Sequence, residues 1–226
     1  MKPVVLFGCG KIAEVVLHYL QDDERYEVAA VTVDREFLPG ETWNGLPTVA
    51  FEDVQEKYPP ADFDMFVALG YQQMNGLRAG KVEAATASGY ELISYVHPDA
   101  AVPSDCEFGP NCFFMQNTLI HPKVKLGSNV FVWSGAMVGH HSVIGDHCWL
   151  TSCTNISGVV TAGEKCFFAV NSTVGHGVTL GKECFVGANA LVVKDGEDGQ
   201  TFIVEATKAH RLTSAQFLRL SKFDDL

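Results

Sequence analysis

The sequence predicts an N-terminal α/β domain followed by a parallel β-helix, and three observations lead to this fold class. An apolar residue recurs at every sixth position from Val102 to Val192 without an insertion, which is the period of a parallel β-helix. Residues 3–8 and 28–33 read as buried strands, and a glycine turn and a helical pattern lie between them. The chain of 226 residues is long enough for both parts.

The β-helix explains which residue types occupy the two inward positions of each hexad. Each hexad is expected to form a short strand with one large and one small inward side chain, followed by a tight corner at which glycine relieves steric strain. Free cysteine behaves as a small buried hydrophobe, and the small inward place holds Cys106, Cys112, Cys148, Cys166 and Cys184. Three hexads make one triangular coil, so residues eighteen apart should form columns along the prism.

The first 98 residues are expected to form the α/β domain. Further strands are predicted at 64–69 and 91–96, with a helix at 72–88 between them and a loop-rich segment at 34–60. We place the domain boundary between residues 98 and 99 and assign 99–226 to the β-helix and its C-terminal cap. The cap would be the amphipathic helix predicted at 214–223, and a plain surface helix is the alternative.

A glycine turn follows the first strand. The segment from Gly8 to Ala13 fits the pattern G-x-G-x-x-A, and Asp34 ends the second strand 24 residues after Gly10. In a dinucleotide fold such glycines admit phosphate to the helix N-terminus, and the acid binds ribose hydroxyls. A turn with only a geometric role is the alternative. The domain is too short for two nucleotide-binding halves, so its size suits a mononucleotide.

The carboxyl ends of the parallel strands should form the ligand-binding edge of this domain. The candidates at this edge are Gly8, Gly10, Lys11, Asp34, Arg35, Gly70 and Tyr71, with His97 as a further one.

Composition and charge narrow the function classes. Acidic residues outnumber basic ones by 27 to 16, which gives a net charge of −11 and argues against general nucleic-acid binding. The first residues carry charge and glycine where a signal peptide needs an apolar run, and no apolar run is long enough to span a membrane. We therefore expect a cytoplasmic protein. No CxxC pair occurs, so neither a zinc site nor a redox motif is indicated.

Histidines distinguish one column of outward positions. His140 occupies the third place of its hexad, and the column at eighteen-residue spacing holds Pro122, His140, Gly158, His176 and Lys194. With one strand spacing per coil, His140 and His176 should lie roughly 10 Å apart. A histidine on a rigid wall can act as a general base near neutral pH. A surface histidine that only forms hydrogen bonds is the alternative.

Together, the N-terminal domain, the hexads and the segment His140-x-x-Val143-Ile144-Gly145 resemble the sugar O/N-acyltransferases of the PglD and sialic-acid O-acetyltransferase (NeuD) type. The resemblance covers nearly the whole chain. It implies that the β-helix is left-handed and that the N-terminal domain is a half-Rossmann domain. It also implies a homotrimer with active sites between neighbouring β-helices, acetyl-CoA along the prism, and a nucleotide-linked amino sugar on the N-terminal domain.

The resemblance also assigns roles to residues. It implies that Gly8, Gly10, Lys11 and Asp34 bind the nucleotide, that His140 is the catalytic histidine, and that Gly158 makes a backbone contact to the pantetheine arm. We further expect substrate contacts from Arg35, Gly70 and His141, and CoA contacts from His176, Ala188 and Lys194. Lys182 and Arg211 are further candidates for the CoA phosphates, and no metal ligand is expected.

Two departures from the family pattern stand out. Family members often carry Asp or Glu directly after the catalytic histidine, whereas this chain has His141. A second imidazole cannot supply the fixed charge with which a carboxylate raises the basicity of a histidine. In addition, Trp133 and Trp149 stand where related enzymes carry polar active-site residues. We expect these tryptophans to serve packing, in an apolar pocket or at the trimer contact.

The function we predict is N-acetylation of a nucleotide-linked amino deoxysugar by acetyl-CoA, with His140 as general base. O-acetylation of a sialic-acid-like sugar is the alternative within the class, and a non-catalytic nucleotide-binding β-helix protein is the alternative outside it. An NAD-linked enzyme would need a second mononucleotide half. A zinc-dependent β-helix enzyme would need three converging histidines, and the histidines of this chain show no such pattern.

Overall fold

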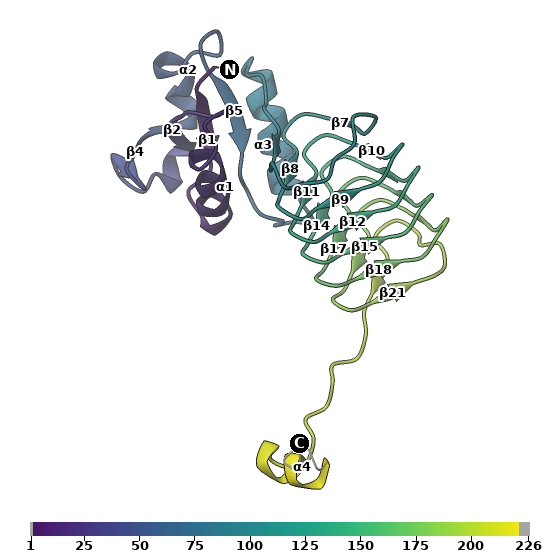
Figure 1. Cartoon of the computed structure of the whole chain (residues 1–226). Coiled ribbons are helices and arrows are strands. Elements are labelled where there is room, and N and C mark those ends of the chain that lie inside the picture. Colours follow the sequence, from purple (N-terminus) through teal and green to yellow (C-terminus); the bar gives the residue numbers. More distant parts are fainter. Residues whose placement is uncertain (1, 222–226) are drawn as a thin grey trace.

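The computed structural model describes residues 2–221 and contains both predicted parts, an N-terminal α/β domain and a three-sided prism of stacked coils (Figure 1). The central sheet of the α/β domain has the strand order β3-β4-β2-β1-β5. Its strands are β1 (Val4–Phe7), β2 (Val28–Val33), β3 (Thr42–Trp43), β4 (Leu46–Ala50) and β5 (Asp64–Val67). Its helices are α1 (Lys11–Gln21), α2 (Val54–Lys57) and α3 (Gly76–Ala87), with short 3-10 turns η1 (Arg35–Phe37) and η2 (Phe51–Asp53).

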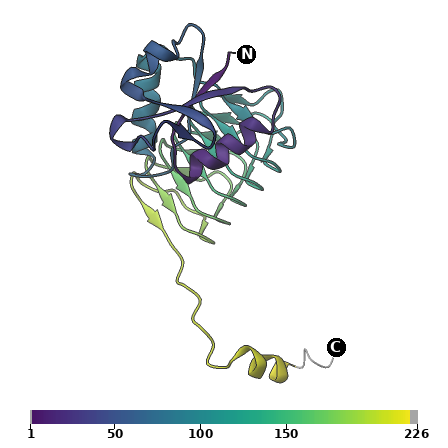
Figure 2. The same cartoon turned by 90° about the vertical axis from the view of Figure 1, so that its left-hand side faces the viewer.

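Alternate residues of β1 and β5 point to opposite faces of this sheet, and each face is buried. Val4, Leu6 and Phe66 pack with α1 and with aromatic side chains of the prism, whereas Val5 and Val67 pack with α2 and α3. The strands therefore read as continuous apolar runs, as expected for parallel strands covered on both faces. Figure 2 shows α1 crossing in front of the first coils.

Two elements of this domain differ from the sequence prediction. The segment 34–60 contains a hairpin, in which Asn44 and Gly45 adopt φ values of +47° and +80° and connect β3 to β4 as an Asn-Gly turn does. Strand β4 then pairs in parallel with β2. The predicted helix at 72–88 begins only at Gly76, because Gln73, Met74 and Asn75 all have positive φ.

The hexads form the left-handed β-helix that the sequence indicates. From Tyr95 to Val192 its strands pair in parallel at eighteen-residue spacing, as in the pair Phe131 and Trp149. The β8 sheet contains β6 (Tyr95–Val96), β8 (Phe113–Phe114), β11 (Phe131–Val132), β14 (Trp149–Leu150), β17 (Phe167–Phe168), β20 (Phe185–Val186) and β22 (Thr201–Phe202). The last pair of this sheet is two residues shorter, since Phe185 of β20 pairs with Thr201 of β22.

The other two faces of the prism are five-stranded sheets. The β9 sheet contains β9 (Leu119–Ile120), β12 (Met137–Val138), β15 (Asn155–Ile156), β18 (Thr173–Val174) and β21 (Leu191–Val192). The β7 sheet contains β7 (Glu107–Phe108), β10 (Lys125–Leu126), β13 (Val143–Ile144), β16 (Thr161–Ala162) and β19 (Thr179–Leu180). The predicted large and small inward residues form one continuous core, in which Cys112, Cys148, Cys166 and Cys184 are fully buried.

The outer face of the β8 sheet carries an aromatic ladder that covers the α/β domain. Its members are Tyr95, Phe113, Phe131, Trp149, Phe167 and Phe185. Phe131 and Trp149 stack with ring centroids 4.8 Å apart and an interplanar angle of 10°. Strand β6 belongs to this ladder, although the sequence assigns 91–96 to the α/β sheet; only the bridge from Leu92 to Met65 joins that sheet.

A polar cluster fixes the junction between the two parts. Arg78 of α3 is fully buried, with its guanidinium 4.4 Å from the ring centroid of Phe131 and 5.0 Å from that of Trp149. It donates hydrogen bonds to Asn75 and to the carbonyl oxygen of His147, at 3.0 and 2.8 Å. Its Nε and Nη1 atoms have no partner among residues 2–221. Burial lowers the pKa of Arg78 to about 9, with no carboxylate to offset it.

Asn111 adds a second polar contact across the junction. Its side chain accepts a hydrogen bond from the backbone N–H of Val67 at 2.7 Å and donates one to the carbonyl oxygen of Val67 at 3.1 Å. The same amide also donates to Asn129 in the next coil. The side chain thus satisfies the edge of β5 as a neighbouring strand would, because buried backbone groups need hydrogen-bond partners.

The C-terminal segment leaves the prism. Beyond β22 an extended stretch leads to α4 (Ser214–Ser221), which lies away from the last coil in both ribbon views (Figures 1 and 2). Phe217, Leu218 and Leu220 of this helix are exposed. Within residues 2–221 of one chain, α4 does not close the end of the prism as the predicted cap would. The expectation for residues 222–226 lies outside the described residues.

Replacing Arg78 tests how far the junction depends on its packing. The Arg78→Ala variant loses two cation–π contacts and two hydrogen bonds, so its free energy of unfolding should fall by about 3 kcal/mol. The Arg78→Met variant keeps most of the volume and removes the cost of burying a charge, so it should lose much less. Equilibrium urea unfolding of both variants measures the difference, and equal losses would contradict this account.

Candidate functional site

The glycine turn begins the nucleotide half of the candidate site. Gly8 has φ of +132°, and a Cβ atom there would lie 2.8 Å from the carbonyl oxygen of Ala68. The position therefore requires glycine in order to bring β1 and β5 together. Gly10 is the N-cap of α1, and no side chain caps this helix end. Its first backbone N–H groups are thus available to an anion.

Two adjoining pockets open beside this turn and share Gly10 and Leu69. The smaller pocket, of about 210 Å³, is lined by Phe7, Cys9, Gly10, Val33, Asp34, Phe37, Leu69, Leu77 and Lys81. The larger pocket, of about 500 Å³, is lined by Gly10, Lys11, Ile12, Ala68, Leu69, Gly70, Tyr71 and Gln72. Gly8 shapes the turn, and the predicted residues Gly10, Lys11, Asp34 and Gly70 are therefore gathered at this edge.

Asp34, the acidic residue that follows β2, forms an ion pair. Lys81 of α3 donates to Asp34 at 2.6 Å, at the mouth of the smaller pocket. Sequence reasoning missed Lys81, although Leu77 and Lys81 are four residues apart and so share one face of α3. Arg35 is directed elsewhere, because its guanidinium donates to Asp53 at 2.7 Å and lines neither pocket. Its predicted substrate contact would require that ion pair to break.

His97 does not lie at the ligand edge, so that expectation is wrong. Its ring packs against Tyr19 and Tyr95, and it lines a surface hollow with Asp22 and Arg25, at the opposite end of α1 from Gly10. The physical reason is that β6 pairs with β8 and so leads His97 away from the central sheet.

The second half of the site is the corner between the β9 and β7 sheets, which we call the histidine corner. It consists of His140 and His141 together with Gly158, His176 and Lys194 of the following coils. A Cβ atom at Gly158 would lie 2.7 Å from Nε2 and 2.8 Å from Cε1 of His140. The imidazole therefore rests on the bare backbone of Gly158, and only glycine leaves room for it there.

This placement changes the expected spacing of the histidines. The ring centroids of His140 and His176 are 6.2 Å apart, much closer than the spacing of two coils, because the His140 ring leans over the intervening glycine. On its other side, His140 Nδ1 lies 3.2 Å from His141 Nδ1. The Gly158 N–H donates no hydrogen bond to any described residue, so it is available to a ligand.

Ala188 lies on a different corner from the other predicted CoA contacts. It follows β20 and precedes β21, so it is at the corner between the β8 and β9 sheets. The β9 sheet thus separates Ala188 from the histidine corner, and one CoA molecule on a single prism would have to cross that sheet to contact both.

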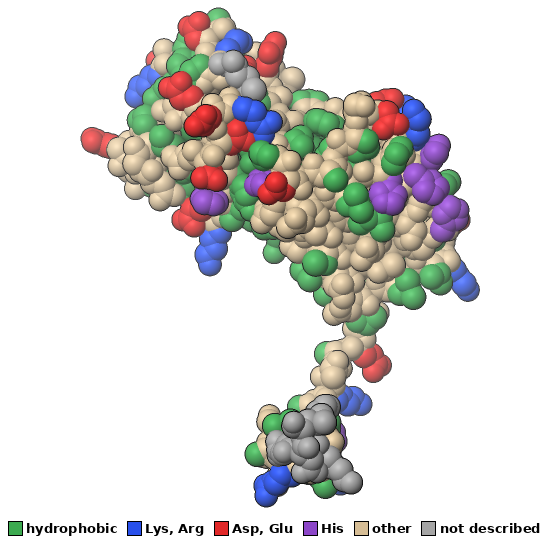
Figure 3. All heavy atoms as spheres, in the orientation of Figure 1, with side chains coloured by type: hydrophobic (Ala, Val, Ile, Leu, Met, Phe, Trp, Pro, Cys, Tyr) green, Lys and Arg blue, Asp and Glu red, His purple; other side chains and the backbone are tan. Residues whose placement is uncertain are grey.

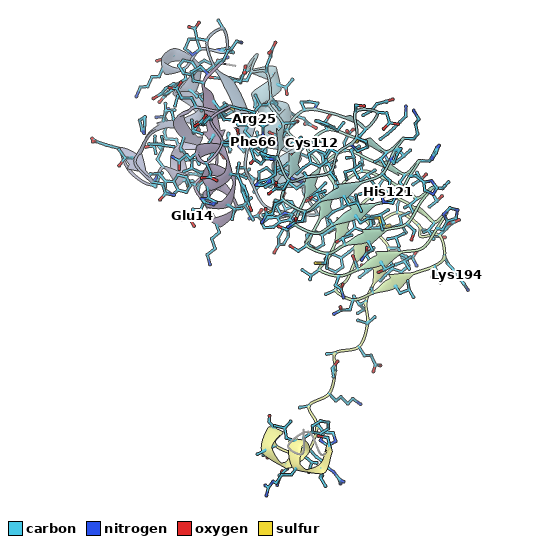
Figure 4. The ribbon with its side chains drawn as sticks, in the orientation of Figure 1. Glu14, Arg25, Phe66, Cys112, His121 and Lys194 are labelled. Carbon is cyan, nitrogen blue, oxygen red and sulfur yellow. The ribbon has the colours of Figure 1, made fainter. Side chains whose placement is uncertain are left out.

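The histidine corner is remote from the nucleotide turn of the same chain. The space-filling view shows a group of histidines at the edge of the prism opposite the α/β domain (Figure 3). His121 and Lys194 mark this edge in Figure 4, whereas Glu14 of α1 lies on the far side. The β8 sheet faces the domain, and the histidine corner joins the other two sheets.

The two tryptophans lie at the junction, so the expected packing role is confirmed. Trp149 is 1 % exposed and contacts Phe131, Trp133 and Tyr71. This contact joins the two parts of one chain, and the expected role at a trimer contact stays a prediction. The aromatic ladder also packs against the ring of Tyr71, which contacts Trp149 and Phe167. Tyr71 in turn lines the larger pocket.

Two further features concern metals and membranes. Among residues 2–221, no group of three or more His, Cys, Asp or Glu side chains is arranged to hold a metal ion. No helix in the described part of the chain has the length and apolar character needed to cross a membrane.

Solved structures of sugar N-acetyltransferases are similar to this chain over most of its length. PerB from Caulobacter crescentus, in complex with CoA and GDP-perosamine, has a TM-score of 0.80 and 27% identity and covers 91% of this chain and 98% of its own. The acetyltransferase domain of PglB from Neisseria gonorrhoeae, in complex with acetyl coenzyme A, has a TM-score of 0.78 and 25% identity, with coverages of 88% and 95%. WeeI from Acinetobacter baumannii shares the fold at 18% identity and a TM-score of 0.77.

No family model and no curated protein matches the chain. The structures nevertheless confirm the resemblance that the sequence indicates, since their fold is the left-handed β-helix with an N-terminal α/β domain. The structural neighbours of this chain are CoA-dependent N-acetyltransferases that act on amino sugars.

Substitution of Gly158 tests whether the glycine positions the imidazole. The Gly158→Ala variant should lower kcat by about 100-fold, because its Cβ displaces the His140 ring from its place. The free energy of unfolding should stay nearly unchanged, since the displaced atoms belong to a mobile side chain. Steady-state kinetics and thermal unfolding measure the two effects. Unchanged kcat would show that the ring does not need this surface.

Proposed function

We propose that this chain is an acetyl-CoA-dependent N-acetyltransferase that acts on an amino deoxysugar linked to a nucleotide. The observation that carries the proposal is the combination of an uncapped helix N-terminus beside two pockets and an imidazole supported on a glycine of the β-helix. The similarity to enzymes crystallised with CoA, acetyl coenzyme A and GDP-perosamine supports the choice of reaction.

The nucleotide sugar would bind along the edge of the α/β domain. Its diphosphate would lie at the N-terminus of α1, where the backbone N–H groups after Gly10 favour an anion. The smaller pocket has apolar walls and one polar pair, Asp34 and Lys81, and would hold the nucleoside. The larger pocket continues past Tyr71 and would direct the sugar outward.

Acetyl transfer would take place at the histidine corner. The neutral amine of the sugar attacks the thioester carbonyl carbon, and His140 Nε2 accepts the proton that the amine loses. The C–S bond then breaks, and the imidazolium of His140 returns the proton to the leaving sulfur, so that CoA departs as the thiol. The free N–H of Gly158 is a suitable donor to the oxyanion or to the pantetheine arm. His176 and Lys194 lie farther along the column, where they would contact CoA.

The active site would require a second copy of the chain, and we propose a homotrimer. The nucleotide turn and the histidine corner lie on opposite sides of one molecule, so the two halves would meet only between neighbouring subunits. The outer face of the β9 sheet, next to the histidine corner, exposes Leu119 by 44 % and Leu191 by 65 %. This apolar face would form the contact, and Ala188 and the histidine corner would then border the same groove.

The location of the reaction follows from its substrates. Nucleotide sugars and acetyl-CoA are cytoplasmic metabolites, so we place the protein in the cytoplasm, in a pathway of glycan assembly. O-acetylation of a sugar hydroxyl is the competing reaction, which a panel of acceptors separates from N-acetylation.

Replacement of His140 tests the proposed base. Loss of a positioned general base should lower kcat by about 100-fold to 10,000-fold in the His140→Ala variant, because the amine then loses its proton to water. The measurement is thiol release from acetyl-CoA with a panel of nucleotide amino sugars and the matching hydroxy sugars. Near-normal kcat at saturating substrate would contradict the assignment of the base.

A charge on the β9 sheet tests the trimer. The Leu191→Glu variant would place one carboxylate of each subunit in the proposed contact, so the protein should shift from trimer to monomer and lose acetyl transfer. The Val143→Glu variant, on the β7 sheet, is the control, because Val143 is also an exposed apolar residue, at 42 %, but lies on another face. Sedimentation velocity gives the masses; a trimer that survives in Leu191→Glu excludes this face.

A further inference from the structure

The histidine corner contains a pair of imidazoles that face each other through the same ring atom. The Nδ1 atoms of His140 and His141 lie 3.2 Å apart, and the two rings are close to perpendicular, with an interplanar angle of 85° and centroids 5.4 Å apart. Two unprotonated nitrogens would repel each other at this distance, so one proton must lie between them. Each ring is therefore the hydrogen-bond partner that sets the tautomer of the other.

His140 is exposed to solvent, and the Nε2 side of its ring faces away from His141. Its Nε2 atom extends over Gly158, where a Cβ atom would lie only 2.7 Å away, and the His176 ring lies beyond. Because Nδ1 is occupied by His141, only Nε2 can take a proton from a bound amine. The direction of the shared hydrogen bond therefore decides whether His140 can act as a base.

We propose that His141 is the positioning residue for His140, and that the two imidazoles work as a pair that shares one proton between their Nδ1 atoms. This proposal rests on the proposed acetyl transfer. When His140 donates to His141, Nε2 of His140 is free and accepts the proton of the amine. When His141 donates to His140, Nε2 carries a proton and the base is blocked. A carboxylate at this position could only accept, so it would hold the first arrangement alone.

The pair also determines the effect of pH. One added proton leaves both Nε2 atoms protonated and the shared proton in place, whichever ring donates. A single protonation of the pair therefore stops catalysis. By eighteen-residue spacing, the titratable groups in the column of His140 are His176, two coils on, and Lys194, three coils on. Those in the column of His141 are Lys123 and Asp105, one and two coils before it, and Asp195, three coils after it. Lys123 is paired with Asp105 at 3.1 Å, and Asp195 accepts a hydrogen bond from the N–H of Thr179. Among the described residues, no carboxylate forms an ion pair with either imidazole.

The backbone at His141 allows a clean substitution. Its φ is +59°, and the same corner position is occupied with similar φ by Asn111, Asn117, Asn129, Asn171 and Asn189. Asn and Asp adopt this conformation more readily than most residues. His141→Asp and His141→Asn are therefore matched variants, equal in size and compatible with the fold, which differ in a fixed negative charge and in the ability to donate.

The experiment compares the pH dependence of kcat, at saturating substrates, for the wild type and these two variants. The His141→Asp carboxylate stabilises the imidazolium of His140, so its acid limb should lie about one pH unit above that of His141→Asn. His141→Gly, which suits the positive φ but supplies no partner, should lose about tenfold in kcat with little change in KM. His141→Asn should recover most of that loss. His121→Asn, which removes another imidazole on this edge of the prism, should change neither kcat nor the acid limb of its pH dependence.

A second measurement does not depend on turnover. Nuclear magnetic resonance of protein with ¹⁵N-labelled histidine reports which ring nitrogen of His140 carries the proton. At high pH the His141→Asp variant should show His140 protonated at Nδ1 only, and the wild type should show a mixture of both tautomers. The proposal would be overturned if the His140 signals were identical in the wild type, His141→Asp and His141→Asn, or if the acid limbs of kcat for the two variants coincided. If no acceptor is acetylated, the proposed function fails, and the tautomer signals still decide whether the pair exists.

Discussion

Parallel pairing at a fixed eighteen-residue spacing is the constraint on which the rest of this structure depends. Because the coils from β6 to β21 pair with one another in the same register, a residue type that recurs at one outward position becomes a continuous wall. Two such walls define the molecule. An aromatic ladder on the β8 sheet covers the α/β domain, and a column on the opposite corner carries the histidines. The backbone pairing fixes both, so neither can shift without changing the other.

The same stacking makes a missing side chain as important as one that is present. His140 lies across Gly158 because the coil below offers no Cβ atom, and this brings its ring within 6.2 Å of His176. Glycine thus has two separate roles in the chain. At Gly8 it permits a backbone conformation and a close approach to β5, whereas at Gly158 it leaves space for another residue.

The sequence predicts those features that follow from periodicity. The hexads and the glycine turn predicted the coils, the inward cysteines and the edge that holds Gly10, Lys11 and Asp34, because period and strand order determine which residues become neighbours. Contacts between distant segments were not accessible in this way. The burial of Arg78 against the β-helix, the ion pair of Lys81 with Asp34 and the position of His97 each depend on how the two parts pack. Single side chains also lean by several ångströms, as the His140 ring does, and no spacing rule describes that.

The junction has a consequence for the choice of substrate. Asn111 and Arg78 join the α/β domain to the prism through buried contacts, so the domain has little freedom to swing. In the proposed homotrimer, the span between the turn at Gly10 and an imidazole of the adjoining subunit would then be fixed by the assembly. Hinge bending could not adapt this span to a nucleotide sugar whose reactive amine lies at a different distance from its phosphates. Such a protein would act as a ruler, selecting sugars by the reach from their phosphates to the reactive nitrogen.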